Sequence, residues 1–170
     1  MIKLIFKDSE WADKSFTFIN NEINKILKKK SRCNLILTGG RCAKKIYNVW
    51  SNHLKKENFN KLYFYLTDER NVPTSNENSN YKMISDNLFL NFEKKNLNFY
   101  KFETELKDKK KIIDNYNNKL PNTIDITLLS IGDDGHVASI FPNDMCVINS
   151  NSNVSFVHRK LKPDRFTVTP

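Results

Sequence analysis

The most specific chemical signal in the sequence is a histidine within a glycine-containing loop. His136 follows Gly132-Asp133-Asp134-Gly135, directly after a long apolar run. A histidine titrates near neutral pH, so it can take a proton from water and return it, as ester or lactone hydrolysis requires. The sequence has no Gly-x-Ser-x-Gly elbow and no His-Glu-x-x-His motif, which disfavours serine and zinc hydrolysis. We predict that His136 is a general base, whereas His53 and His158 are predicted to be structural.

A second candidate loop places three charged residues, Asp68-Glu69-Arg70, directly after another apolar run. Charges at the end of a buried strand are costly unless they are paired or functional. The planar guanidinium of Arg70 suits a phosphate or an oxyanion, and Asp68 suits a sugar hydroxyl or a histidine. A local ion pair between Arg70 and either neighbouring carboxylate is the alternative interpretation.

A third candidate is the pair Gly39-Gly40, which is followed by Arg41. A glycine turn between a strand and a helix presents free backbone N–H groups to an anion at the start of the helix. The segment therefore predicts a phosphate-binding turn, and a tight turn without a ligand is the alternative. It matches neither a Walker loop nor the dinucleotide fingerprint Gly-x-Gly-x-x-Gly.

The elements that must position these loops alternate along the chain. Apolar runs predict strands, and the segments between them repeat apolar residues at three- and four-residue steps, as amphipathic helices do. This alternation predicts an α/β domain with three layers, in which helices cover both faces of a mostly parallel, Rossmann-like sheet. Ligands of such sheets bind at the carboxyl ends of the strands, where the three loops lie. The predicted strands are 2–6, 34–38, 62–67, 97–101, 124–131, 154–157 and 166–168, and the helices start near Ser9, after Gly40, near Ser79 and near Leu106.

Length, charge and composition limit the class of protein. The chain has 170 residues, which favours one domain over residues 1–170. Its net charge is +9, but the basic excess is concentrated in the first third of the chain, so a solvated basic surface is favoured over a nucleic-acid interface. No apolar stretch approaches the roughly 20 residues of a membrane span. We expect a cytoplasmic protein without a membrane partner. Three cysteines without metal spacing predict no metal site.

Taken together, the three loops resemble the 6-phosphogluconolactonase family. The resemblance rests on Leu37 to Gly40, Thr67 to Tyr81, Leu128 to Pro142 and the tail Lys162 to Pro170. This family is related to the glucosamine-6-phosphate deaminases and shares their sugar-phosphate-isomerase type of fold. The resemblance implies hydrolysis of 6-phospho-D-glucono-1,5-lactone to 6-phosphogluconate in the oxidative pentose phosphate pathway, with no metal or organic cofactor.

The resemblance also implies roles for individual residues. His136 would activate water, Asp68 would orient His136 or the sugar, and Arg70 would bind anionic oxygen. The remaining residues expected to contact the substrate or its phosphate are Gly39, Gly40, Arg41, Gly132, Asp134, Gly135 and Arg165.

Two alternatives stay open at this point. Deaminases of the related group follow Asp-Gly-His-x-Ala with Phe-Asn-Glu-Pro, whereas this chain has Ser139-Ile140-Phe141-Pro142 without a glutamate, which favours a lactonase. Lactonases usually continue the glycine turn with Ser-Thr-Pro, but here Arg41-Cys42-Ala43 follows, and family members usually continue beyond the last predicted strand. A C-terminally incomplete domain is therefore expected. The second hypothesis is a catalytically silent module that binds a sugar phosphate or a dehydrogenase of the same pathway.

Overall fold

Two fully apolar strands form the centre of a parallel sheet. The computed structural model describes residues 3–53, 59–92, 97–160 and 162–170. Strand β1 (Cys33–Leu37) is buried along its whole length and pairs in parallel with β2 (Leu62–Leu66) on one side and β4 (Ile126–Thr127) on the other. Unbroken apolar strands are typical of sheets covered on both faces. The predicted parallel sheet is confirmed for these strands.

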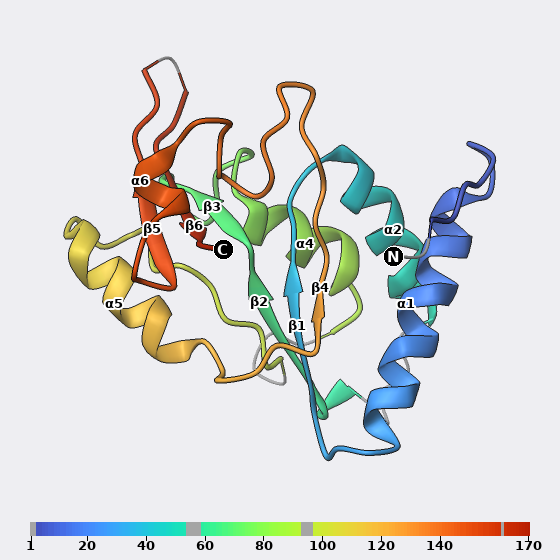
Figure 1. The fold of residues 1–170 in the computed structure, drawn as a ribbon. Helices are drawn as coiled ribbons and strands as arrows, with labels where there is room; N and C mark the ends of the chain where they lie inside the picture. Colours follow the sequence, from blue (N-terminus) through green and yellow to red (C-terminus); the bar gives the residue numbers. More distant parts are fainter. Residues whose placement is uncertain (1–2, 54–58, 93–96, 161) are drawn as a thin grey trace.

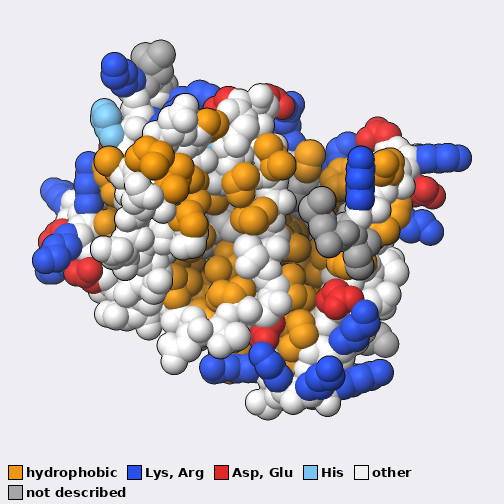
Figure 2. Space-filling view, in the orientation of Figure 1, with side chains coloured by type: hydrophobic (Ala, Val, Ile, Leu, Met, Phe, Trp, Pro, Cys, Tyr) orange, Lys and Arg blue, Asp and Glu red, His pale blue; other side chains and the backbone are white. Residues whose placement is uncertain are grey.

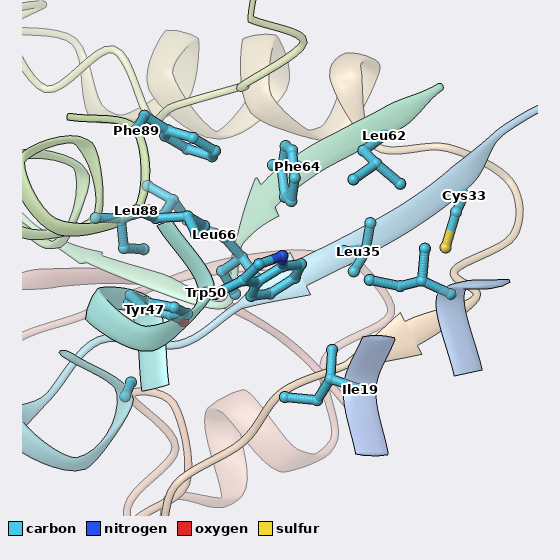
Figure 3. Packing of buried hydrophobic residues seen from close by; sticks show 14 of the residues in the cluster. Ile19, Cys33, Leu35, Tyr47, Trp50, Leu62, Phe64, Leu66, Leu88 and Phe89 are labelled. Carbon is cyan, nitrogen blue, oxygen red and sulfur yellow. The ribbon is translucent and has the colours of Figure 1, made fainter. Parts of the chain in front are cut away.

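Helices pack around this sheet and supply most of its core. Figure 1 shows α1 and α2 on one side of the strands and α5 on the other, as the predicted α/β architecture requires. Trp50 of α2 is the largest side chain that is fully buried, and its ring meets Phe64 of β2 edge-on at 6.1 Å (Figure 3). The described helices are α1 (Trp11–Leu27), α2 (Arg41–His53), α4 (Asn80–Leu88), α5 (Lys109–Lys119) and α6 (Met145–Ile148).

A second, antiparallel sheet adjoins the carboxyl end of the first. Its strands lie in the order β3 (Asp68–Arg70), β6 (Arg165–Val168) and β5 (Val154–Val157). Thr67 connects the two sheets, because its N–H donates to Leu37 of β1 and its carbonyl accepts from Val168 of β6. The first sheet is thus parallel, and the second, which begins at the charged loop, is antiparallel. The apolar runs did not predict this change of strand direction.

The β2 edge of the parallel sheet is hydrogen-bonded by the loop at Asn98 to Tyr100 and by the side chain of Tyr116. The N–H and carbonyl of Phe64 bond to Asn98 and Tyr100, which reduces the predicted strand 97–101 to a single bridge at Phe99. The hydroxyl of Tyr116 from α5 bonds to both the N–H and the carbonyl of Leu66, at 2.6 and 2.8 Å. Burial raises the pKa of this hydroxyl far above its usual range, so it remains a neutral donor and acceptor.

Of two other predicted strands, 124–131 is shorter than its apolar run and 2–6 does not form over its described residues. The run 124–131 forms only the two-residue strand β4, because the chain leaves the sheet after Leu128 donates to Ile36. Leu129 and Ile131 are then 56% and 77% exposed, and Leu129 lines a hollow of about 930 Å³ that β4 borders. Apolar side chains gather across the middle of the face seen in Figure 2. Residues 3–6 form no strand, and residue 2 lies outside the described residues.

Two helices, α1 and α4, begin close to their predicted starts. α4 begins beside Ser79 as predicted, and Ser79 caps it, since its Oγ accepts the N–H of Lys82. α1 also begins near the predicted Ser9, but its N-cap is Glu10, which makes no capping bond with its side chain. Among the described residues, no helix has both the length and the apolar character needed to cross a membrane.

Candidate functional site

Asp68 lies at the junction of the two sheets and joins three loops. It is only 4% exposed and accepts hydrogen bonds from Ser139 Oγ at 2.6 Å, Thr67 Oγ1 at 2.9 Å and Asn80 Nδ2 at 3.3 Å. Its other close neighbour is the guanidinium of Arg165, 4.0 Å away. The described contacts of Asp68 therefore include Ser139 and exclude His136, so direct orientation of His136 by Asp68, one of its two expected roles, is not seen.

Glu69 anchors the charged loop to the start of α4. Its side chain is fully buried and accepts hydrogen bonds from the backbone N–H groups of Arg70, Asn80 and Tyr81 and from Ser79 Oγ. Burial raises the pKa of the Glu69 carboxyl, and the four donors oppose that shift. Glu69 fixes the backbone of Arg70 instead of forming the ion pair with Arg70 that the sequence left open.

Two arginines lie opposite each other on adjacent strands of the antiparallel sheet. Arg70 of β3 and Arg165 of β6 occupy paired positions in the strand register. Arg70 donates from Nη1 to the carbonyl of Asn78, and Arg165 donates from Nη1 to Ser139 Oγ. The Nε atoms of both guanidinium groups are buried without a hydrogen-bond partner in the described structure. Paired like charges in a sheet are destabilising, so this arrangement favours binding of an anion.

The electrostatics of Arg165 are consistent with an anion site. Arg165 is 8% exposed, and its pKa is lowered mainly by this burial. The positive charge of Arg70 lowers it further, whereas the carboxylates of Asp68 and Asp134 oppose the shift. An anion bound beside these two guanidinium groups would compensate the cost of bringing them together.

His136 is held by a neighbour within its own loop. Nδ1 of its ring bonds to Oδ1 of Asp134, and this bond lowers the pKa of the Asp134 carboxyl. The ring lies 4.9 Å from the ring of Phe141 and is only partly exposed. A carboxylate on Nδ1 fixes the tautomer and leaves Nε2 to exchange a proton with a reactant.

The glycines of the His136 loop make room for the imidazole and the turn. A Cβ added to Gly132 would lie 2.2 Å from Cε1 of His136, so only glycine fits beneath this ring. Gly135 has a φ of +81°, a left-handed conformation that glycine adopts without strain. These glycines shape the loop that holds the imidazole.

At Gly39, the first position of the glycine turn after β1, the lack of a side chain makes room for a neighbouring residue. The space beside Gly39 is filled by Asn80, whose Oδ1 would lie 2.1 Å from an added Cβ. Gly40 has a φ of +102° and open space around an added Cβ, with Ser130 Oγ at 3.9 Å as the nearest atom. Arg41 is exposed at the first position of α2, and the part of the chain that the structure describes offers its guanidinium no hydrogen bond.

We expect Gly39→Ala to destabilise the fold by about 1 to 3 kcal/mol, because the new methyl would displace Asn80 from Asp68. Chemical denaturation of Gly39→Ala, Asn80→Ala and the double variant measures this coupling. The cost of Gly39→Ala should shrink in the Asn80→Ala background, where the colliding atoms are absent. An equal cost in both backgrounds would show that Asn80 does not explain the glycine.

Some residues of the site were not among the predicted site residues. Ser139 bridges Asp68 and Arg165, Asn80 links Asp68 to the glycine turn, and Phe141 packs against His136. Each lies inside a segment that carried the family resemblance, so their position was a usable signal. Their roles depend on which buried group each side chain meets, and short polar or aromatic residues do not indicate this by spacing.

Fold and site together define an α/β domain in which His136 and Arg165 both lie beside the ring of Phe141, beyond the carboxyl ends of the parallel strands. The chain belongs to the glucosamine-6-phosphate isomerase and 6-phosphogluconolactonase family, whose sequence model matches residues 7–170.

Individual relatives agree with this family. A 6-phosphogluconolactonase of Borreliella burgdorferi is 30% identical over 99% of this chain, which spans 74% of that relative. A Thermotoga maritima 6-phosphogluconolactonase is also 30% identical, over 81% of this chain and 62% of its own length. The crystal structure of a 6-phosphogluconolactonase from Thermotoga maritima superposes with a TM-score of 0.85 at 28% identity, covering 98% of this chain and 76% of that one.

Proposed function

We propose that this protein hydrolyses 6-phospho-D-glucono-1,5-lactone to 6-phospho-D-gluconate. The observation that carries the proposal is the placement of His136, whose ring is bonded to Asp134 and contacts Phe141, while Arg165 lies over the same Phe141 ring at 5.6 Å. A general base and a cation at one aromatic side chain suit a substrate that carries both a reacting carbonyl and an anionic group. The lactonase names of the relatives support the same reaction.

In the proposed reaction, Nε2 of His136 takes a proton from water as the water oxygen bonds to C1 of the lactone. The bond between C1 and the ring oxygen then breaks, and His136 returns its proton to that oxygen. The product acid loses a proton to solvent and becomes the carboxylate. Asp134 stabilises the imidazolium through Nδ1, and Arg70 and Arg165 bind the anionic oxygens of the substrate.

The proposal is tested with lactone generated immediately before the measurement. Acid release in a weakly buffered solution is recorded with and without protein, because the lactone also opens spontaneously. A protein-dependent rate proportional to enzyme concentration is expected. A rate equal to the blank, at protein concentrations where 6-phosphogluconate binds, would favour the silent sugar-phosphate-binding module. Release of ammonia from glucosamine 6-phosphate would instead indicate a deaminase, which the absence of a glutamate after Ala138 disfavours.

The substrate phosphate has two candidate sites, the arginine pair of β3 and β6 and the glycine turn before Arg41, and a pair of variants separates them. Arg70→Ala should raise the KM at least tenfold, because it removes a charge-assisted bond from a partly buried guanidinium. Arg41→Ala should change it less than about threefold, since an exposed charge contributes little. Steady-state kinetics with the phosphorylated lactone measure both. The opposite order of effects would assign the phosphate to the glycine turn.

Two further expectations stay predictions from the sequence. Association with a dehydrogenase of the same pathway would be tested by sedimentation of the two proteins together. Location in the cytoplasm would be tested by fractionation of the source cells.

A further inference from the structure

Arg159 is a cation that the family resemblance did not include in the site. It follows β5 in the connection to β6, and its backbone N–H donates to Oδ1 of Asp164 at 2.9 Å. Its guanidinium carbon lies 3.7 Å from the centre of the Phe141 ring. Stacking at this distance holds a guanidinium in place while leaving its N–H groups at the edge of the ring.

The ring under Arg159 is the one that borders the proposed base. The imidazole of His136 lies 4.9 Å from the centre of Phe141, and the guanidinium of Arg165 lies 5.6 Å from it. Phe141 thus has two guanidinium groups and the catalytic candidate around a single aromatic ring. Arg159 therefore belongs spatially to the same site, although it lies outside the segments that carried the resemblance.

Among the described residues, the three arginines have a single carboxylate within ion-pair distance. Within the described residues, Arg165 has one carboxylate at 4.0 Å, that of Asp68, and neither Arg70 nor Arg159 has one within that distance. Arg70 and Arg159 both lower the pKa of Arg165, after the larger effect of its burial, so the charges act on one another. Three neighbouring guanidinium groups with so little compensation form a site for a multiply charged anion.

We propose that Arg159 is a substrate-binding residue that, with Arg70 and Arg165, holds the phosphate dianion and selects phosphorylated over unphosphorylated sugar acids. This inference rests on the proposed lactonase function for the identity of the substrate. A phosphate carries about two negative charges and three terminal oxygens, which suits donors arriving from three side chains. The oxyanion that forms at C1 carries a single charge and would not need the third arginine.

The test compares the binding of two ligands that differ only in the phosphate. Isothermal titration calorimetry measures 6-phosphogluconate and gluconate with the wild-type protein, Arg159→Ala and Arg159→Lys. Arg159→Ala should weaken 6-phosphogluconate binding about tenfold to a hundredfold and leave gluconate binding unchanged. Arg159→Lys should retain part of the affinity, because it keeps the charge but loses the planar fork. The affinity of Arg159→Ala should also depend less on salt.

A matched arginine serves as the control. Arg32 likewise lies over an aromatic ring, at 5.5 Å from the centre of Tyr63, but it precedes β1 at the opposite end of the strands. Arg32→Ala should leave both affinities unchanged. Equal weakening of both ligands in Arg159→Ala, or a matching fall in thermal midpoint, would assign Arg159 a packing role on Phe141 and overturn the proposal. No change in 6-phosphogluconate affinity would overturn it as well.

The inference and the proposed function fail in distinguishable ways. Inorganic phosphate is titrated in parallel, because it tests the arginine site without reference to the lactone. Phosphate binding that Arg159→Ala weakens, in a protein that does not hydrolyse the lactone, supports the anion site and overturns the lactonase. Lactone hydrolysis with an unchanged KM in Arg159→Ala supports the lactonase and overturns the role of Arg159.

Discussion

Replacing His136 by alanine is expected to slow enzymatic hydrolysis of 6-phosphogluconolactone by about 10²- to 10⁴-fold, the usual contribution of a general base. The expectation follows from the bond between Nδ1 and Asp134, which leaves Nε2 as the proton acceptor. The substitution should change stability little, since the ring is partly exposed and packs mainly on Phe141. Acid release above the spontaneous rate, together with a thermal melt, measures both effects.

His158 provides a matched control for this experiment. It also bonds through Nδ1 to a carboxylate, that of Asp164, but its side chain is 75% exposed. His158→Ala should retain the wild-type rate. If His136→Ala also retained it, the base would have to be another group of the loop, and Asp134 is the next candidate.

Replacing Asp68 by alanine is expected to lower the free energy of unfolding by about 3 to 5 kcal/mol. Asp68 is 4% exposed, and its loss would leave the buried guanidinium of Arg165 without its carboxylate. It would also leave the hydroxyls of Ser139 and Thr67 without their acceptor at the junction of the sheets. Urea denaturation followed by circular dichroism measures the loss.

Two comparisons make the Asp68 prediction specific. Asp68→Asn keeps the shape but removes the charge, so it should cost less than alanine while still lowering lactone turnover through Arg165. Asp114→Ala removes an exposed aspartate of α5 and should stay within about 0.5 kcal/mol of the wild type. A loss of stability in Asp68→Ala no larger than in Asp114→Ala would show that the junction does not depend on this carboxylate.

The central strands and the start of α4 were predictable because their signals are local. An unbroken apolar run must be buried on both faces, and β1 and β2 follow such runs closely. Ser79 caps α4 through its own hydroxyl, which needs no distant partner. Similarly, the charged loop after β2 and the glycine loop of His136 were identified by residue types that are unusual at strand ends.

Strand extent and direction were not local properties. The apolar run 124–131 predicts a long strand, but a strand extends only as far as its hydrogen-bonded neighbour, and β4 pairs with β1 at two positions. The antiparallel sheet of β3, β6 and β5 joins segments almost a hundred residues apart, and its register sets Arg70 opposite Arg165. Apolar patterning constrains the faces of strands and carries no information on such pairing.

The sequence by itself therefore determined the family, the α/β class and the three loops that carry reactive or charged side chains, because each depends on residue types within one short segment. Only the tertiary structure decided which of those side chains meet. It brought Ser139 to Asp68, set Arg70 opposite Arg165 and placed Arg159 on Phe141. The physical reason is that a buried polar group must find a partner of suitable geometry among all residues brought near by folding, and that choice depends on distances the linear order does not contain.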